Sequence, residues 1–276
     1  MGIKFTKMHG CGNDYIYLDC LKGCPENLPE LSKKLSPRHF AVGSDGLICI
    51  CKSDVADARM RMFNADGSES AMCGNGVRCV AQWLYENEYV GDTASVETGA
   101  GIKTMRRMGE GLWEVQMGKA EFAPASLPVQ GFGEEPVINK ELMVGGRAWS
   151  VTCVSMGNPH CVTIVKDAAA IEIEKIGPAF EHHTAFPEGV NVEFIQLIGP
   201  QHVKMRVWER GSGETLACGT GACATAAACV AMGLCEPQKP IQVDLLGGTL
   251  TIVVSGNWRV QMTGPTQTVF VGETCI

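Results

Sequence analysis

The sequence lacks runs of basic residues, is poor in aromatic residues and has no uninterrupted apolar stretch long enough to span a bilayer. Of its 276 residues, 7% are aromatic and 19% are charged, and the formal net charge is -7. An acidic chain without Lys or Arg runs is not expected to bind nucleic acid or an anionic membrane surface. The opening residues, MGIKFTKMHGCGNDY, also lack the apolar core of a secretory signal, so we expect a cytoplasmic protein.

A Cys-x-x-Cys pair is absent as well, although the chain has 14 cysteines. Cys20-x-x-x-Cys24 and Cys49-x-Cys51 have no matching second pair, so we predict no metal site. In a long chain without a secretory signal, most cysteines are expected to be reduced thiols that pack as small hydrophobic side chains. This interpretation covers Cys11, Cys20, Cys24, Cys49, Cys51, Cys79, Cys153, Cys161, Cys223, Cys229, Cys235 and Cys275.

What the sequence does have is an internal repeat. The stretches AMCGNGVRC (71–79) and LACGTGACA (216–224) each place a cysteine before Gly-x-Gly and a helix-like continuation. A shift of 145 residues lays Cys73 on Cys218, and the same shift lays GCGNDY on SMGNPH and GLWEVQM on GNWRVQM. Three separated segments in one register indicate a duplication.

Two copies predict two similar domains with an active-site cleft between them. We expect the first domain to span 1–118 and the second to span 119–263. The segment 264–276, GPTQTVFVGETCI, has no counterpart in the first half and is predicted to return to the first domain and complete it.

Short segments broken by Gly, Asn and Asp predict mostly strands, such as GLICIC and ARMRMF in the first copy and VNVEFIQLI and VKMRVW in the second. One helix stands out in each copy, directly after the cysteine turn. In the first copy its apolar residues share one face, whereas GACATAAACVAMGL in the second is small and apolar all round, as in a fully buried helix. The sequence therefore predicts an α+β fold, with a curved, mainly antiparallel sheet or barrel around a central helix in each domain.

The cysteine turns predict a particular chemistry. The first N–H groups of a helix have no partners within it, and together with the helix dipole they favour an anion. A thiol at that end is expected to have a lowered pKa. If a substrate carboxylate lies there, one thiolate could remove the proton from its α-carbon while the opposite thiol returns a proton to the other face. The pair Cys73 and Cys218 therefore indicates racemisation or epimerisation by two bases, without a cofactor.

Polar residues beside apolar strands are further candidates. Asn13 and Asn158 are partners in the repeat, which favours a functional interpretation over an ordinary turn asparagine. Asn64 and Asn191 also stand beside strand-like runs. Glu209-Arg210 could form a surface ion pair, but its place just before Cys218 favours a ligand-facing pair, since Arg presents a fork that suits a carboxylate.

At these residues the sequence resembles the diaminopimelate epimerases over nearly its whole length. The motifs that carry the resemblance are HGCGNDY, FNADGSESAMCGNGVRC, GNPHCV, GVNVEF and ERGSGETLACGTGA. The wider superfamily includes proline racemases, in which the first motif usually has His where Asn75 stands. The resemblance implies cofactor-independent interconversion of LL- and meso-diaminopimelate in the lysine and cell-wall pathway, by an enzyme that is typically homodimeric.

The resemblance also implies roles for individual residues. Cys73 and Cys218 are the implied acid/base pair. The implied ligands of the reacting centre are Gly74, Asn75, Gly219 and Thr220, those of the distal end are Asn64, Asn191 and Arg210, the pocket residues are Asn13 and Asn158, and the supporting residues are Glu209 and His160. Some members carry Gln where this chain has Gly46, so Gly46 is left out of the side-chain contacts.

Two alternatives remain open at the level of sequence. One is a racemase of another amino acid, such as proline or hydroxyproline. The other is a redox-sensing or ligand-binding protein in which the two thiols form a disulfide switch.

Overall fold

The computed structural model describes residues 2–274 and divides into two compact units. Unit 1 takes in Met1–Gln116 and Thr263–Ile276, and unit 2 takes in Met117–Met262. That these units act as two epimerase domains with a cleft between them stays a prediction. Cys275 lies outside the described residues. Among the described residues, no helix has the length and apolar character needed to cross a bilayer.

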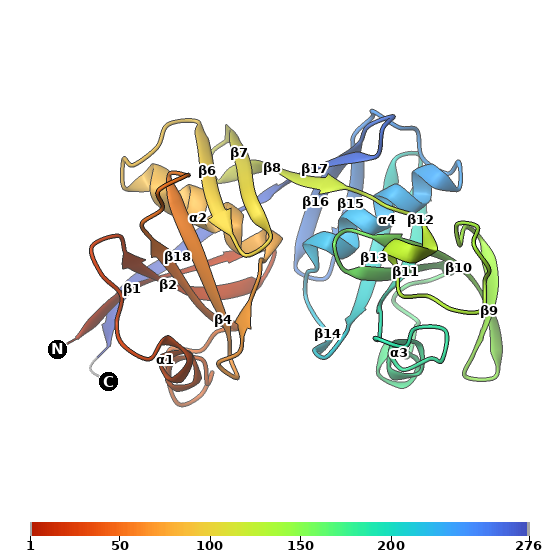
Figure 1. Cartoon of the computed structure of the whole chain (residues 1–276), viewed down its shortest axis with the longest axis horizontal. Coiled ribbons are helices and arrows are strands. Elements are labelled where there is room, and N and C mark those ends of the chain that lie inside the picture. The colour runs from red at the N-terminus through yellow and green to blue at the C-terminus, as the bar shows by residue number, and fades with distance from the viewer. Residues whose placement is uncertain (1, 275–276) are drawn as a thin grey trace. The chain divides into compact units, whose positions relative to one another are not determined.

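Unit 1 is a mixed sheet with a helix on each face (Figure 1). Its strands are β1 (Ile3–Gly10), β2 (Asn13–Cys20), β3 (Gly46–Cys51), β4 (Ala58–Asn64), β5 (Glu69–Ser70), β6 (Thr93–Thr98), β7 (Gly101–Gly109), β8 (Leu112–Lys119) and β18 (Gln267–Thr274), and its helices are α1 (Leu28–Leu35) and α2 (Gly74–Glu86). The sheet order is β18-β1-β2-β3-β4-β6-β7-β8, with β2–β3 and β4–β6 parallel and the other pairs antiparallel.

Unit 2 repeats this plan. Its strands are β9 (Lys140–Val144), β10 (Arg147–Ser155), β11 (Pro159–Ile164), β12 (Asn191–Gly199), β13 (His202–Glu209), β14 (Gly213–Glu214), β15 (Ile241–Leu245), β16 (Gly248–Val254) and β17 (Arg259–Pro265), and its helices are η1 (Pro124–Ser126), α3 (Ile173–Glu181) and α4 (Gly219–Ala231). The order β9-β10-β11-β12-β13-β15-β16 again has two parallel pairs, β11–β12 and β13–β15.

These features confirm the predicted α+β class, with a long helix against each sheet. The strand pairings of the described residues do not close the sheet of either unit into a barrel. The 145-residue shift holds in space as well, since it carries both ends of α2 onto the ends of α4. In α4 all side chains from Gly221 to Cys229 are buried, as expected for a helix that is apolar all round.

The expectation of one helix in each copy was wrong, because α1 and α3 cover the opposite faces of the sheets. Strand β2 shows why both faces are needed. Ile16 and Leu18 pack with Leu31 of α1, whereas the hydroxyl of Tyr17 donates to the carbonyl of Gly76 in α2 at 3.3 Å. Both missed helices are short, and α3 contains an internal proline. Neither therefore shows the helical repeat of apolar residues over enough turns to be recognised in the sequence.

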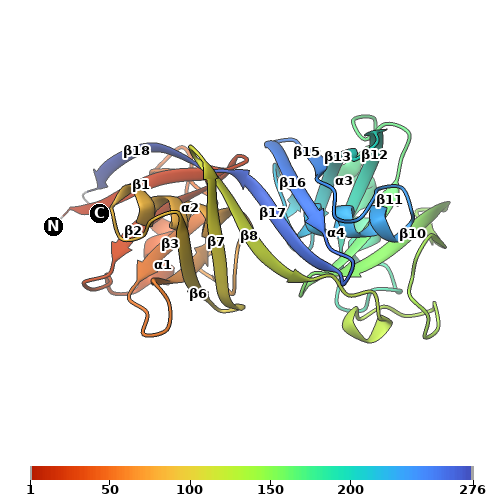
Figure 2. The same ribbon diagram turned by 90° about the horizontal axis from the view of Figure 1, so that it is seen from above.

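Strand β18 has a structural counterpart that the repeat does not reveal. Strand β18 lies antiparallel to β1 at the edge of unit 1 (Figure 2). In unit 2, β9 is likewise antiparallel to β10. In unit 2 the two strands form a hairpin through Gly145 and Gly146, both with positive φ, as a tight two-residue turn requires. In unit 1 the equivalent strand comes from the other end of the sequence.

Candidate active site

The cysteine turn of unit 1 lies where β5 leads into α2. Cys73 is the N-cap of α2, with φ -131° and ψ 122°, and its Sγ accepts a hydrogen bond from the backbone N–H of Gly76 at 3.3 Å. A Cβ at position 76 would lie 2.7 Å from Cδ1 of Ile48, so a larger residue there would displace that buried side chain. The thiol therefore lies beside the first N–H groups of the helix, at the positive end of its dipole.

Asn13, at the start of β2, contacts the same thiol. The S–H of Cys73 donates to Oδ1 of Asn13 at 3.2 Å, and Nδ2 of Asn13 donates to the carboxylate of Asp45 at 2.7 Å. Because an ionised carboxylate only accepts hydrogen bonds, Asp45 fixes which end of the Asn13 amide faces the cysteine. Nδ2 of Asn75 also points to Oδ1 of Asn13, at 3.5 Å. Three of the predicted site residues thus lie together in unit 1.

Arg78 orients the first turn of α2 from within the core. It is fully buried, and its guanidinium donates to Oδ1 of Asn75 at 2.8 Å and to the carbonyl of Gly74 at 3.3 Å. Both partners belong to the cysteine turn that the sequence predicts to hold substrate. Arg78 is therefore a positioning residue for that turn, and sequence reasoning missed it.

The cysteine turn of unit 2 has the same backbone geometry. Cys218 is the N-cap of α4, with φ -117° and ψ 111°, and its Sγ accepts from the N–H of Gly221 at 3.3 Å. The hydroxyl of Thr220 lies 3.5 Å from the same sulfur and accepts from Nδ2 of Asn158 at 3.4 Å. The repeat therefore preserves both the thiol and the N–H group that it faces.

A buried hydrogen-bonded chain extends from this turn into the sheet. Nε2 of His160 lies 3.0 Å from Oδ1 of Asn158, and Nδ1 lies 2.7 Å from Oε1 of Glu193. Because the Asn158 oxygen accepts, Nε2 carries a proton, and a second proton lies between Nδ1 and Glu193. Both His160 and Glu193 are fully buried, and burial raises the pKa of Glu193 to about 7, against the opposing charge and hydrogen bond of His160. The pair can therefore be neutral overall inside the sheet.

The prediction that the helix end lowers the thiol pKa is wrong for Cys218. Its side chain is only 5% exposed, and burial is the main cause that raises its pKa well above the ordinary value. The carboxylates of Glu209 and Glu193 raise it further, and together these effects outweigh the Thr220 hydroxyl and the Gly221 N–H. Cys218 therefore rests as a thiol that can donate a proton.

The two units surround their thiols with different chemistry. The shift of 145 residues lays Tyr15 on His160 and Ile48 on Glu193. Both pairs occupy matching strand positions, since Tyr15 pairs with Gly46 in β2–β3 and His160 pairs with Asn191 in β11–β12. Burial raises the pKa of the Tyr15 phenol well above its ordinary value, so it remains neutral. The cysteine turn in unit 1 thus has an uncharged phenol where unit 2 has an acid–imidazole pair.

The predicted distal residues of unit 2 lie next to one another. Oδ1 of Asn191 accepts from the backbone N–H of Arg210 at 2.9 Å, and its Nδ2 donates to the carbonyl of Pro159 at 2.8 Å. The exposed guanidinium of Arg210 donates to the carbonyl of Glu188 at 2.9 Å, which anchors one of its nitrogens. Asn191 therefore orders the segment that presents Arg210.

The remaining polar candidates lie at strand ends. Asn64 ends β4 and donates to the hydroxyl of Ser68 at 2.9 Å. Glu209 occupies the matching end of β13, and its carboxylate accepts from the hydroxyl of Thr215 at 2.5 Å.

Gly46 has a steric reason to lack a side chain. A Cβ there would lie 2.1 Å from the carbonyl oxygen of Phe63, on the neighbouring strand. A Gln side chain therefore does not fit this backbone at position 46.

Glu193 is the second residue that sequence reasoning missed. Its Oε2 is buried without a hydrogen-bond partner among the described residues, and a Cβ at Gly221 would lie 2.7 Å from its Oε1. The available signal was an acidic residue inside the apolar run GVNVEF, at the place where the first copy has Ile48.

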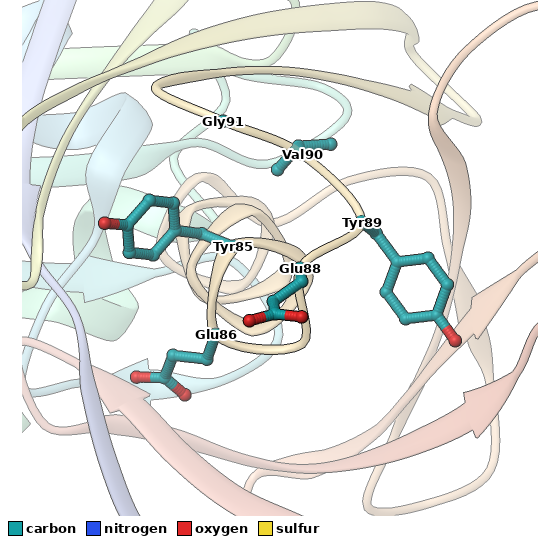
Figure 3. A pocket seen from close by; sticks show the side chains of 6 residues that line it. All are labelled: Tyr85, Glu86, Glu88, Tyr89, Val90 and Gly91. Carbon is teal, nitrogen blue, oxygen red and sulfur yellow. The ribbon is translucent and has the colours of Figure 1, made fainter.

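A shallow hollow at the carboxyl end of α2 contains none of the predicted site residues. It is lined by Tyr85, Glu86, Glu88, Tyr89, Val90 and Gly91 (Figure 3). The ring of Tyr85 is already engaged by Trp113 and by the guanidinium of Arg107, 4.4 Å from the ring centre. The hollow is therefore ordinary helix-end surface.

Comparison with known proteins decides the family. The family model described as diaminopimelate epimerase matches residues 5–123 and 152–269. The chain belongs to the diaminopimelate epimerase family. A diaminopimelate epimerase of Methanococcus maripaludis strain C5 is 49% identical over 281 residues, covering 98% of this chain and 99% of that one. One of Agathobacter rectalis is 47% identical at the same coverage. Membership makes the protein an isomerase of the epimerase class.

Solved structures show the same fold at low identity. A Bacillus anthracis phenazine biosynthesis protein of the PhzF family has a TM-score of 0.72 and 18% identity, with 100% of both chains covered. A hydroxyproline epimerase from Agrobacterium vitis, solved with trans-4-hydroxy-L-proline, has a TM-score of 0.69 and 16% identity, covering 99% of this chain and 92% of that one. At these identities the likeness concerns the fold alone.

Proposed function

We propose that this enzyme interconverts LL- and meso-diaminopimelate, with Cys73 and Cys218 as the two bases at one α-carbon. The observation that carries the proposal is the repeated turn, in which each sulfur faces the N–H group three residues on at 3.3 Å. Family membership and two relatives named diaminopimelate epimerase support the choice of substrate.

The proposed reaction breaks one C–H bond and forms another. One cysteine, as thiolate, takes the α-proton, and the electron pair of the broken bond stays on the α-carbon. The other cysteine, as thiol, then gives its proton to the opposite face. The enzyme ends each turnover with thiol and thiolate exchanged, so that it is ready for the reverse reaction. The raised pKa of Cys218 suits the role of donor.

Main-chain and side-chain donors stabilise the charge in this proposal, in place of a cofactor. The N–H groups at the starts of α2 and α4 are proposed to hold the substrate carboxylate and the developing negative charge. The reacting centre is assigned to Gly74, Asn75, Gly219 and Thr220, the distal end to Asn64, Asn191 and Arg210, the pocket wall to Asn13 and Asn158, and support to Glu209 and His160.

Solvent exchange tests the reaction. Enzyme incubated with LL-diaminopimelate in deuterated water should place deuterium at one α-carbon as the meso isomer appears, followed by NMR and mass spectrometry. Treatment with a carbonyl reagent that traps pyridoxal phosphate, or with EDTA, should leave the rate unchanged. A rate that depends on an added cofactor would refute the cofactor-independent mechanism.

Cysteine variants test the two bases. Cys73→Ser and Cys218→Ser should each lower kcat by at least about a thousandfold, since each removes one of two obligatory proton transfers. The matched control is Cys79→Ala, which removes a buried thiol further along α2 and should keep most of the activity. Full turnover in either serine variant would contradict the two-base assignment.

A substrate panel tests the first alternative, a racemase of another amino acid. Such an enzyme would turn over proline or hydroxyproline faster than diaminopimelate. A redox switch would need a Cys73–Cys218 disulfide, detectable by mass spectrometry, that forms and breaks reversibly with activity. The homodimer and the cytoplasmic location are further proposals, and light scattering of the purified enzyme tests the first.

A further inference from the structure

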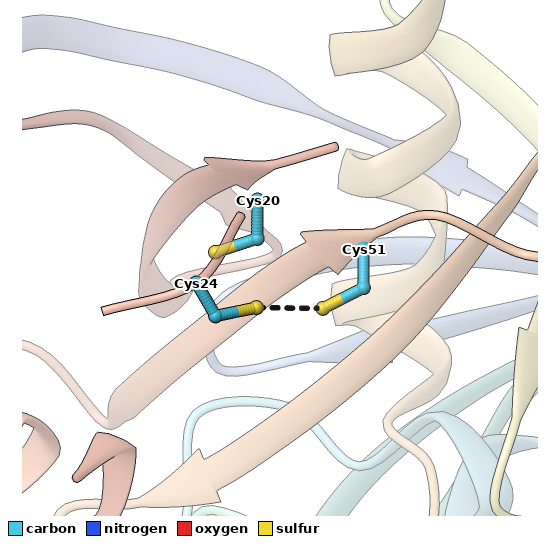
Figure 4. Close-up of side chains that lie close together, drawn as sticks. All are labelled: Cys20, Cys24 and Cys51. Carbon is cyan, nitrogen blue, oxygen red and sulfur yellow. Dashed lines mark hydrogen bonds between the residues drawn. The ribbon is translucent and has the colours of Figure 1, made fainter. Parts of the chain in front are cut away.

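Three cysteines of unit 1 meet at the carboxyl ends of two parallel strands. Cys20 ends β2 and lies directly opposite Cys51, which ends β3. Cys24 follows in the next turn, where the N–H of Gly23 donates to the carbonyl of Cys20 at 3.3 Å. Figure 4 shows the three sulfurs gathered at this edge, with Sγ of Cys24 3.5 Å from Sγ of Cys51. All three sulfurs lie within 4.8 Å of one another.

The sequence analysis predicts no metal site here, because Cys20-x-x-x-Cys24 and Cys49-x-Cys51 are each incomplete when taken separately. Because β2 and β3 are parallel, Cys20 at the end of β2 lies beside Cys51 at the end of β3. The spacing of the cysteines along the chain does not reveal this. None of the predicted catalytic or binding residues belongs to this cluster.

The spacing of the sulfurs suits one metal ion. Thiolate sulfur lies about 2.3 Å from zinc, so sulfurs that share one ion in tetrahedral or trigonal geometry lie about 3.8–4.0 Å apart. The separations of 3.5 Å and at most 4.8 Å bracket that value. A disulfide would instead require the sulfurs to approach to about 2.05 Å and would leave the third thiol unused.

The fold itself does not require thiols at these positions. The 145-residue shift lays Cys20, Cys24 and Cys51 on Val165, Ala169 and Gln196. In unit 2, Val165 lies just past the end of β11 and Gln196 lies within β12. Unit 2 thus has no cysteine at the matching positions, so the cluster is a property of unit 1 and not of the repeated architecture.

Access from solvent also suits a bound cation. Cys20 and Cys51 are buried, whereas Cys24 is exposed and offers an entry path. Each thiol that binds a metal must give up its proton.

We propose that Cys20, Cys24 and Cys51 bind one soft metal ion of the Zn²⁺ or Cu⁺ class, with Cys24 closing the site from solvent. Thiolate ligands select such ions over Mg²⁺ or Ca²⁺. The bound ion ties the turn after β2 to the end of β3, so that binding stabilises unit 1 without taking part in epimerisation.

Metal titration of the reduced, chelator-treated protein tests the proposal. Cd²⁺ is the spectroscopic probe, because it gives thiolate charge-transfer absorption, and Zn²⁺ affinity is measured by competition with a chromophoric chelator. The full-length protein should bind one equivalent, release protons, gain thermal stability and keep its epimerase activity. Cys24→Ser, at an exposed position, should weaken binding by about a hundredfold or more.

Cys235→Ser is the matched control, since Cys235 also lies beside a second thiol, Cys229, and is outside the cluster. It should bind metal as the unchanged protein does. The proposal would be overturned by no binding at micromolar metal, by equal affinity in the Cys24→Ser variant, or by a Cys24–Cys51 disulfide that forms in place of the metal complex. Loss of activity on metal binding would also overturn it, by placing the ion on the catalytic thiols.

Discussion

The buried carboxyl of Glu193 makes the stability of the protein depend on pH in a defined window. Its pKa rises from 4.5 to about 7 on folding, chiefly because burial disfavours the charged form. A pKa shift of one is equivalent to about 1.4 kcal/mol, so this shift corresponds to about 3 kcal/mol of unfolding free energy. Between pH 4.5 and about 7 the folded protein holds a proton that the unfolded chain has released, so the free energy of unfolding falls as the pH rises and then levels off.

Glu193→Gln removes this contribution while keeping the shape of the side chain and a hydrogen bond to Nδ1 of His160. Urea unfolding of both proteins, followed by circular dichroism from pH 5 to pH 8, gives the difference in free energy at each pH. Over this range that difference should change by about 2.5 kcal/mol in favour of the variant and should level off above about pH 7.

A second variant separates titration from hydrogen bonding. Glu193→Ile introduces the residue that unit 1 carries at the matching position, Ile48, and removes both the proton and the hydrogen bond. It should show the same flat pH response as Glu193→Gln but lose more epimerase activity, because His160 is no longer oriented. Parallel stability profiles for the unchanged protein and both variants would refute the reasoning.

Three further substitutions test contacts of the candidate site. Gly46→Gln should destabilise the protein by at least about 2 kcal/mol in calorimetry, because the new Cβ meets the carbonyl of Phe63; an unchanged Tm would contradict this. Gly221→Ala should lower kcat by about a hundredfold in the epimerase assay, since its Cβ displaces Glu193 from the thiol turn, whereas helix propensity alone would stabilise it. Arg78→Met should raise KM and cost about 3 kcal/mol in urea unfolding, and unchanged kinetics would argue against its positioning role.

Much of the fold could be predicted because two signals agree. Strands such as β3 and β4 show their apolar pattern directly, and the 145-residue shift links α2 to α4 through motifs that include the catalytic candidates. The shift also links the starts of α1 and α3, Leu28 and Ile173, but these helices are too short to display a period of 3.6 residues. The 145-residue shift does not detect the relation of β18 to β9, because β9 directly precedes β10 in the sequence whereas β18 lies at the opposite end of the chain from β1.

The candidate site likewise contains residues that the repeat predicts and residues that it does not. Cys73 and Cys218 could be chosen because they recur in one register, and Asn13 with Asn158 for the same reason. Glu193 and Arg78 have apolar or unrelated residues at their repeat partners, so the shift gave no support to either. Whether a helix end or a buried environment dominates the pKa of a thiol depends on three-dimensional burial, and at Cys218 burial dominates.

The pairing of β1 with β18 has a consequence for synthesis on the ribosome. Ile3 lies opposite Thr274, whereas unit 2 is one continuous stretch, Met117–Met262. At 5–20 residues per second, translation separates the two partner strands by roughly 15 to 50 seconds. Unit 2 can fold as soon as it emerges, while the first-made strand of the protein waits with an unpaired edge that a chaperone or a neighbouring nascent chain can occupy. The unit made first is therefore the unit completed last.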